Sequence, residues 1–377
     1  MKESVSKIKV VEIIADADLS GGPIHVLNLL RNLDKGKFDP YLICPSGHLV
    51  EEAKNIRDLK IETIEMTSRF DMVAVYQIFR TLQKIQAAAN PFGKMIVHVH
   101  GVRAGFLARL FKLSTAKYIY TEHSLDQNYH LASFGREWLQ KLVLKYLNFK
   151  TDTVIAVSSS VKSYLVSSHL SLKDRTILVP NGFDKESFGL AKIPIKKIKM
   201  CNEAPVVGTI GNLNLQKGQS YLIESMKYIV KKYPLATLEI IGEGEQREKL
   251  EKQIEDLRLV KNITLLGRKS NVVNYLKNWD VFVLPSIAET FGISILEAMA
   301  VGIPVVASKT GGIVDIVKQR KNGLLIEPKN SKAIAEAVIA IISDPIKAAS
   351  YKREAKNTLE KYRWDKIIKE IEAIYEG

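Results

Sequence analysis

The sequence predicts an α/β protein built from two doubly wound parallel-sheet domains that face each other across a cleft. The first supporting observation is length, because 377 residues are enough for two domains. The second is that short β-branched runs alternate with amphipathic helical segments along the whole chain, which is typical of βαβ units. The third is one interruption of this alternation, at residues 181–203, where Gly182, Gly189, Pro194 and a basic run up to Lys199 indicate a linker.

The first predicted domain spans residues 1–188. Its strands are expected at residues 9–15, 41–44, 95–100, 118–121, 153–157 and 176–179. Residues 23–33 carry apolar side chains at helical spacing, including Ile24, Leu27 and Leu30, and predict a helix after the first strand. The loops after parallel strands meet at one edge of the sheet, so ligand-binding residues are expected there.

The second predicted domain spans residues 189–363. Its strands are expected at residues 206–210, 237–241, 264–266, 281–284, 305–307 and 324–326, with helices at 219–233 and 293–299 among the segments between them. The tail, residues 331–376, has a helical pattern that is broken only at Asp344-Pro345. Residues 364–377 are treated as a separate C-terminal helix.

Composition narrows the class of protein. The chain is 46% hydrophobic and 25% charged, and no stretch approaches the ~18–20 apolar residues of a membrane span. The charged start, Met1 to Lys9, does not resemble a signal peptide, and the two cysteines, Cys44 and Cys201, lack metal-ligand spacing, so a cytoplasmic protein is expected. A formal net charge of +14 favours anionic partners, but no basic block predicts nucleic-acid binding.

The strongest functional signal is the segment ETFGISILE, residues 289–297, which follows a predicted strand and enters a predicted helix. Free backbone N–H groups at the start of that helix, around Gly292, Ile293 and Ser294, suit a phosphate or a sugar hydroxyl. Glu289 and Glu297 lie eight residues apart, about two turns if the whole segment is helical, so both carboxylates could accept hydrogen bonds from one ligand.

In each predicted domain, a glycine-containing turn follows the first strand. One is residues 208–218, where Gly208, Gly211 and Gly218 surround Lys217. Glycines let the backbone approach a phosphate and a lysine adds a point charge, but the loop has neither the P-loop spacing nor the G-x-G-x-x-G spacing. The other turn is Gly21-Gly22-Pro23, where Pro23 suits the first position of a helix. A plain surface turn remains the alternative for both.

Histidines end two neighbouring predicted strands, at His98-Val-His100 and at His123. Their positions at the carboxyl edge favour a functional role for His123 first and His100 second. They lack the H-x-x-x-H spacing of zinc ligands. Asp16 and Asp18 form a D-x-D pattern known from metal-binding sites, but they are interpreted as ordinary loop acids, so no metal is predicted.

Residues 136–150 form a possible amphipathic helix with Trp138, Leu142 and Tyr146 on one face and several lysines elsewhere. Such a helix can lie on an anionic membrane, and it can equally pack on the first sheet. Both interpretations stay open from the sequence.

Taken together, the motifs resemble the retaining glycosyltransferases of family four, which have the GT-B fold of two Rossmann-like domains. The resemblance covers nearly the whole chain. It depends on an ordered series, namely Gly21-Gly22, His100-Gly101, His123-Ser124, Ser158-Ser159, Pro180-Asn181-Gly182-Phe183-Asp184, Lys217-Gly218, Gly242-Glu243-Gly244, Glu289 with Glu297, Gly302-Ile303-Pro304-Val305 and Gly311-Gly312.

The resemblance implies roles for individual residues. Lys217 would bind the donor diphosphate, Glu297 the ribose, and Glu289 the transferred sugar, with His123 near the reaction centre. Backbone groups of Phe291, Gly292, Ile293 and Ser294, with Gly22 and Gly242, would support sugar and phosphate. Asn212 stands where the family usually has an arginine, and Arg268 is the expected substitute. His100 and Tyr129 are acceptor-side candidates. The resemblance also implies that the final helix, residues 364–377, crosses back onto the N-terminal domain.

The implied activity is metal-independent transfer of a sugar, with retention, from a nucleoside diphosphate sugar to a hydroxyl of a glycan or lipid-linked acceptor. Uridine is the expected base, no cofactor is expected, and contact with the inner face of an anionic membrane is expected. A sugar-nucleotide epimerase or a phosphorylase on the same fold is one alternative. A catalytically inactive copy that binds sugar nucleotides or a protein partner is the other.

Overall fold

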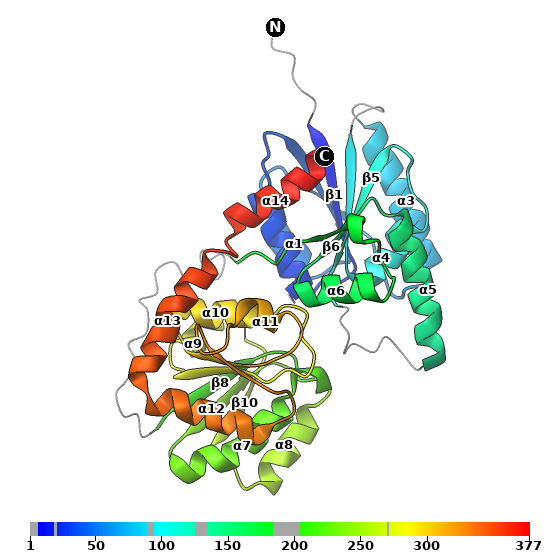
Figure 1. Ribbon diagram of the computed structural model, residues 1–377. Helices are drawn as coiled ribbons and strands as arrows, with labels where there is room; N and C mark the ends of the chain where they lie inside the picture. Colours follow the sequence, from blue (N-terminus) through cyan, green and yellow to red (C-terminus); the bar gives the residue numbers. More distant parts are fainter. Residues whose placement is uncertain (1–6, 19–20, 89–93, 125–133, 184–203, 270) are drawn as a thin grey trace. The chain divides into compact units, whose positions relative to one another are not determined.

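The computed structural model describes residues 7–18, 21–88, 94–124, 134–183, 204–269 and 271–377 (Figure 1). The chain divides into two compact units. Unit 1 contains residues up to Gly182 together with Trp364–Gly377, and unit 2 contains Phe183–Arg363. The predicted boundary at residue 188, and most of the predicted linker, lie outside the described residues.

Unit 1 contains a seven-stranded sheet in the order β3-β2-β1-β4-β5-β6-β7, in which every pairing is parallel. The strands are β1 (Ile8–Ile14), β2 (Phe38–Cys44), β3 (Lys60–Thr63), β4 (Met95–His100), β5 (Ala116–Glu122), β6 (Thr153–Ala156) and β7 (Thr176–Leu178). The chain runs from β1 outward to β3 and then returns to place β4 on the other side of β1. This reversal makes the carboxyl ends of β1 and β4 the expected ligand site.

The helices of unit 1 are α1 (Gly21–Asn32), α2 (His48–Ala53), α3 (Met72–Ala87), α4 (Gly101–Arg109), α5 (Phe134–Lys150), α6 (Ser159–Ser167) and the C-terminal α14 (Trp364–Glu376), with a 3-10 turn at Lys173–Arg175. Helix α14 is the last helix of the chain, yet it packs beside α1 on the first sheet (Figure 1). Its apolar stripe, which includes Trp364, Ile367, Ile371 and Tyr375, joins Val10 and Leu29 in one buried cluster.

Unit 2 contains a six-stranded parallel sheet in the order β10-β9-β8-β11-β12-β13. The strands are β8 (Val206–Ile210), β9 (Thr237–Ile241), β10 (Ile263–Gly267), β11 (Val281–Leu284), β12 (Val305–Ser308) and β13 (Leu324–Ile326). The helices are α7 (Gln219–Lys232), α8 (Arg247–Asp256), α9 (Val273–Leu276), α10 (Ile293–Val301), α11 (Ile313–Ile316), α12 (Ser331–Ser343) and α13 (Pro345–Leu359), with a 3-10 turn at Leu215–Lys217. The order reverses between β8 and β11, which is therefore the switch point.

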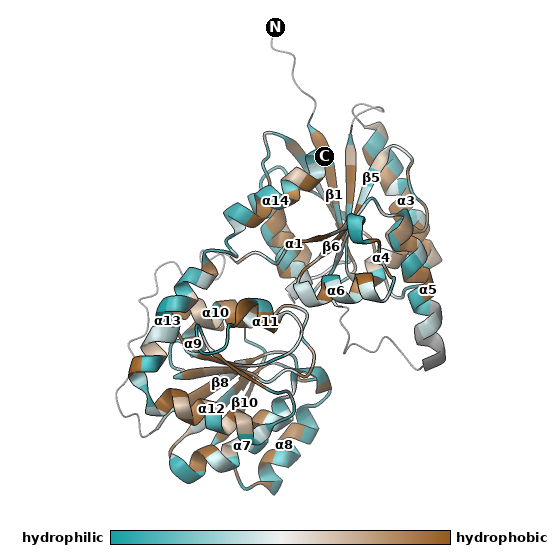
Figure 2. Cartoon of the chain, in the orientation of Figure 1, coloured by the Kyte–Doolittle hydropathy of each residue, from teal (hydrophilic) through white to brown (hydrophobic). Residues whose placement is uncertain are grey.

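The prediction of two doubly wound parallel sheets is confirmed. Most strands are coloured hydrophobic in Figure 2, whereas most helices carry both hydrophilic and hydrophobic residues. Strand β3 was not predicted, because this short edge strand has mostly exposed residues and no apolar run. Among the described residues, no helix is long and apolar enough to cross a bilayer.

Candidate functional site

Unit 2 brings two of the predicted site residues into direct contact at its switch point. The Lys217 ammonium lies 2.5 Å from Oε2 of Glu289, and Ser286 Oγ donates to the same oxygen at 3.3 Å. Lys217 comes from the loop after β8, and Glu289 from the loop after β11, so the pair joins the two strands at which the order reverses. A carboxylate and an ammonium at this edge can hold the hydroxyls and phosphates of one ligand.

Backbone contacts hold the two loops together. Gly218 has a left-handed φ of 64°, and a Cβ atom there would lie 2.3 Å from the carbonyl oxygen of Pro285. The N–H of Ile287 donates to the carbonyl of Gln216 at 2.7 Å. The Gly218 turn thus requires glycine for its backbone angle and for its close approach, and it fixes the place from which Lys217 extends.

The start of α10 lies in the same loop region. Gly292 precedes the helix with a left-handed φ of 98°, no side chain caps the helix, and Ile293 and Ser294 are partly exposed. The first N–H groups of an α-helix have no partners within the helix, so Ile293 and Ser294 offer donors to an anion. Phe291 is buried against Tyr362, and only its backbone can serve a ligand.

Glu297 is the buried carboxylate of the site, with 9% of its surface exposed. Burial raises its pKa to about 7, since the ionised form loses hydration there. The predicted start of the helix near Gly292 is confirmed, since α10 begins at Ile293; Glu289 lies in the preceding loop, so the two-turn spacing of a wholly helical segment does not apply. Glu289 faces Lys217 because of the loop conformation and not because of helical spacing.

The other predicted donor residues lie at the same edge of unit 2. Asn212 is exposed in the loop after β8, and its carbonyl accepts a hydrogen bond from Gln219 at 3.0 Å. Gly242 approaches so closely that a Cβ atom there would lie 2.0 Å from the carbonyl oxygen of Gly211, and its N–H donates to the carbonyl of Gly267. Arg268 is exposed and follows Gly267, the last residue of β10, so its backbone lies at this edge.

Unit 1 contains a buried chain of hydrogen bonds that ends at His123. Glu12 Oε2 lies 2.6 Å from Nε2 of His100, and His100 Nδ1 lies 3.2 Å from Nε2 of His123. The hydroxyl of Tyr375, from α14, donates to Glu12 Oε1 at 2.7 Å. Glu12 and His100 come from the neighbouring strands β1 and β4, and His123 follows β5.

The carboxylate determines where the protons lie in this chain. An ionised carboxylate only accepts, so Nε2 of His100 donates to Glu12. A neutral His100 then accepts at Nδ1, and His123 donates from Nε2, which places the lone pair of His123 on Nδ1. Burial lowers the pKa of His100 to about 4, despite the nearby Glu12, and burial also keeps the pKa of His123 well below its usual value.

Glu12 itself is ionised. Burial opposes its charge, but the neighbouring His98 and the hydrogen bonds from His100 and His98 outweigh burial and hold its pKa well below the usual range. His98 also reaches the Tyr375 hydroxyl at 2.6 Å and Thr121 Oγ1 at 2.7 Å. The network therefore ties strands β1, β4 and β5 to α14 at the carboxyl edge of the first sheet.

Residue spacing in the sequence did not reveal all members of this cluster of histidines and Glu12. Glu12 was included in an apolar strand, and its signal is a carboxylate within the otherwise apolar run KVVEIIA. His25 was not singled out, yet its ring lies 5.1 Å from that of His123. Nitrogens of His25, His100 and His123 lie within 4.8 Å of one another, as metal ligands can, although no two of these histidines have ligand spacing in the sequence.

The remaining candidates of unit 1 are more loosely defined. Gly22 lies in the first turn of α1, directly after the switch-point strand β1. Asp16 and Asp18 are exposed in the intervening loop, where the Asp18 N–H donates to Asp16 Oδ1 at 3.3 Å. Tyr129 lies outside the described residues.

Comparison with solved structures identifies the class. The crystal structure of HepE from Anabaena in complex with UDP-glucose aligns with a TM-score of 0.78 and 18% identity, covering 97% of this chain and 99% of that one. The crystal structure of a sucrose-phosphate synthase from Thermosynechococcus elongatus aligns with a TM-score of 0.77 and 21% identity, over 98% of each chain. The two parallel-sheet units thus have the GT-B fold of glycosyltransferases.

Sequence comparison then gives the family. The model described as "Glycosyltransferase Family 4" matches residues 19–187, and that described as "Glycosyl transferases group 1" matches residues 193–358. An uncharacterized glycosyltransferase of Methanocaldococcus jannaschii is 31% identical over an alignment of 291 residues, and the match covers 74% of this chain and 74% of the relative. The chain belongs to the group 1, family 4 glycosyltransferases, and it is an enzyme of that class.

Another relative is named for its activity. The Escherichia coli UDP-Gal:alpha-D-GlcNAc-diphosphoundecaprenol alpha-1,3-galactosyltransferase is 28% identical over 363 residues, covering 92% of this chain and 91% of the relative.

Proposed function

We propose that this glycosyltransferase moves a sugar from a UDP-sugar to a hydroxyl of a glycan or lipid-linked acceptor, with retention and without a metal ion. The single observation that carries the proposal is the Lys217–Glu289 pair at the switch point of unit 2, beside the open start of α10. An ammonium, a carboxylate and free N–H groups are the set that a sugar diphosphate needs.

In the donor complex, Lys217 exchanges its ion pair with Glu289 for the diphosphate. Glu289 is then available to accept hydrogen bonds from hydroxyls of the transferred sugar, while Glu297 accepts from the ribose. The amides of Ile293 and Ser294 supply further donors to phosphate or sugar. The exposed Arg268 adds charge at the edge where Asn212 has none.

The reaction breaks the bond between the anomeric carbon and the diphosphate oxygen and forms a bond from that carbon to the acceptor oxygen on the same face. The acceptor proton passes to the departing diphosphate. Lys217 and the start of α10 stabilise the negative charge that develops on the diphosphate, which is electrostatic work that needs no metal ion. A double displacement would instead need a carboxylate beneath the anomeric carbon, and neither Glu289 nor Glu297 is assigned that role.

In unit 1, His123 is proposed to contact the acceptor or the transferred sugar, and His100 and Glu12 act through it. The hydrogen-bonded chain fixes the tautomer of His123, so that Nδ1 carries a lone pair suited to a hydroxyl hydrogen bond. His100 is 1% exposed, and it is therefore proposed as a positioning residue and not as an acceptor contact.

The name of the Escherichia coli relative supports a lipid-linked acceptor for this chain too. Such acceptors lie in a membrane, so we place the protein in the cytoplasm at the inner face of a membrane. The net charge of +14 is suited to an anionic surface.

The test is thermal unfolding with a panel of nucleotide sugars in buffer that contains a chelator. A ligand at ~100 times its dissociation constant adds about 2.7 kcal/mol of stability, which gives a clear shift. We expect one UDP-sugar to shift wild type and Lys227→Ala, an exposed-lysine control on α7, but not Lys217→Ala. No shift with any nucleotide sugar would contradict the proposed donor site, and turnover that requires a divalent ion would contradict metal independence. The anomeric configuration of the product, measured by NMR, tests retention.

A further inference from the structure

Helix α5 has two apolar faces, of which only one is buried. Leu144 and Leu147 are 1% and 0% exposed and pack within unit 1. On the other side Trp138, Leu142, Tyr146 and Phe149 are between 45% and 66% exposed. The sequence left open whether this helix packs on the sheet or lies on a membrane, and the structure shows a helix that packs with one side and leaves a second apolar side in solvent.

The exposed residues, which we call the α5 face, are spaced to form one stripe. Positions 138, 142, 146 and 149 recur at intervals of three and four, so their side chains lie along one side of the helix. The helix runs from the carboxyl edge of the sheet, where β5 ends, to the amino edge, where β6 begins. Over 17 residues this is about 25 Å. The α5 face, from Trp138 to Phe149, therefore covers most of the length of the helix.

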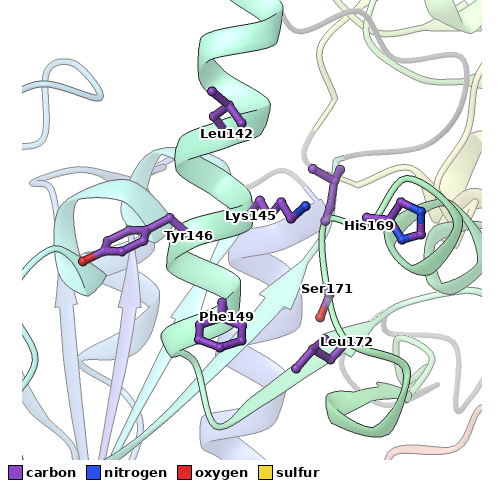
Figure 3. A pocket seen from close by; sticks show the side chains of 8 residues that line it. Leu142, Lys145, Tyr146, Phe149, His169, Ser171 and Leu172 are labelled. Carbon is purple, nitrogen blue, oxygen red and sulfur yellow. The ribbon is translucent and has the colours of Figure 1, made fainter.

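At the amino-edge end the α5 face borders a pocket of about 510 Å³ (Figure 3). The helix contributes Leu142, Lys145, Tyr146 and Phe149, and the segment after α6 contributes His169 to Leu172. Figure 3 shows Lys145 extending from the helix toward that segment. The lining is mostly apolar, and Lys145 and His169 are its basic side chains. A hydrocarbon chain suits such a cavity, and the ammonium at its side suits a phosphate.

Cations surround the stripe. Lys150 lies 4.4 Å from the centre of the Tyr146 ring, and Arg175 lies 5.9 Å from that of Phe149. Asp152, an acid of the same region, is paired with Lys112 at 3.2 Å. Aromatic residues flanked by lysine and arginine are the composition of helices at membrane surfaces.

We propose that the α5 face and its pocket form a docking site for an anionic lipid bilayer, with one lipid chain entering the pocket and Lys145 at the lipid phosphate. Charge complementarity selects this occupant, because a second copy of the chain would bring the same cations against these. Exposed large hydrophobic residues also concentrate in this unit, since thirteen of the eighteen found among the described residues belong to unit 1. The inference rests on the proposed function insofar as a lipid-linked acceptor places the enzyme at a membrane.

The experiment uses Trp138 as a built-in reporter. It is 66% exposed, whereas the other two tryptophans, Trp279 and Trp364, are at most 2% exposed. The full-length protein is mixed at low salt with phosphatidylglycerol-containing vesicles, with phosphatidylcholine vesicles, and with brominated versions of the first. We expect co-sedimentation with the anionic vesicles only, together with quenching of tryptophan emission by the brominated lipid.

Two sets of variants test the site. Leu142→Ser with Phe149→Ser, and separately Lys145→Glu with Lys150→Glu, should bind anionic vesicles at least about tenfold more weakly than wild type. The control, Val260→Ser with Ile346→Ser, removes equally exposed apolar side chains from unit 2 and should bind as wild type does. All of them should keep the thermal shift with the UDP-sugar, which separates this inference from the proposed function.

The inference is overturned if wild type stays in the supernatant with anionic vesicles, or if it sediments without quenching of Trp138. It is also overturned if neither double variant at α5 weakens binding, or if sedimentation velocity shows a dimer that the Leu142→Ser, Phe149→Ser variant abolishes. Failure of the UDP-sugar shift in wild type would instead contradict the proposed function, whatever the vesicles show.

Discussion

Replacing Glu297 by glutamine should stabilise unit 2 of the ligand-free protein while weakening its binding of the donor. Burial raises the pKa of Glu297 from 4.5 to about 7. The folded state therefore holds the proton more tightly than the unfolded state, and above pH 7 it carries a buried charge that the unfolded chain carries in water. Glutamine has the same shape and no charge to desolvate.

The size of the gain follows from the two pKa values. A carboxyl shifted from 4.5 to about 7 destabilises the folded state by about 3 kcal/mol at pH 8 and by about 1 kcal/mol at pH 5. The sign is that of a raised carboxyl pKa, so the unfavourable contribution grows as pH rises through this range. Glu297→Gln should thus be more stable than wild type by about 3 kcal/mol at pH 8, and the advantage should shrink toward pH 5.

Hydrogen exchange of the β8 and β11 amides measures the stability of unit 2 alone, and calorimetric titration with UDP measures the donor site. Loss of a hydrogen bond to a charged group weakens binding by about 1.5–3 kcal/mol, or roughly 10- to 100-fold. Glu336→Gln, an exposed carboxylate on α12, serves as the control and should change neither quantity. The reasoning is refuted if Glu297→Gln is no more stable than wild type at pH 8, if its advantage does not depend on pH, or if UDP binds it as tightly as wild type.

Three further predictions concern the two sites. Because His100 has a pKa of about 4 in the folded state against 6.5 unfolded, this residue alone should cost unit 1 about 2 kcal/mol between pH 7 and pH 5, and His123, whose pKa is also well below its usual value, should add to the loss. Exchange of the β1 and β4 amides measures it, and equal protection at both pH values would contradict the buried neutral histidines. Glu12→Gln should lower kcat more than it raises KM and should shift the acid limb of the pH profile, because a glutamine amide can either accept from or donate to His100 and no longer fixes its tautomer; an unchanged pH profile would leave Glu12 a structural residue only. Gly218→Ala should destabilise unit 2 by about 1–3 kcal/mol and weaken UDP binding, since its Cβ atom would lie 2.3 Å from the Pro285 oxygen. If calorimetry finds the stability of unit 2 and the affinity for UDP both unchanged, the turn tolerates a side chain.

The loops at the carboxyl edge of the unit 2 sheet, where the donor is proposed to bind, were largely predictable because the sequence patterns that indicate them are local. A glycine-bounded turn with Lys217, and a strand followed by a loop and a helix start at Gly292, are defined by neighbouring residues, and parallel strands bring such loops to one edge. The direct contact of Lys217 with Glu289 was not predictable, since it depends on the register of β8 and β11 and on the conformation of two loops.

The histidine cluster shows the limit of local patterns. His100 and His123 were located at strand ends by their sequence context, but the partner that fixes their protons is Glu12, in a strand that reads as apolar core. Nothing near Tyr375 in the sequence connects it with Glu12, 363 positions away, and only the packing of α14 beside α1 joins them.

By itself the sequence determined the two parallel-sheet units, the carboxyl edges of the sheets where the candidate site residues lie, and the family. It could do so because periodicity, turn residues and short motifs are local properties of the chain. Tertiary structure alone decided the ion pair at the switch point, the protonation of the buried histidines, the raised pKa of Glu297 and the second apolar face of α5. Each of these depends on desolvation or on a contact between distant segments, and both arise only when the chain has packed.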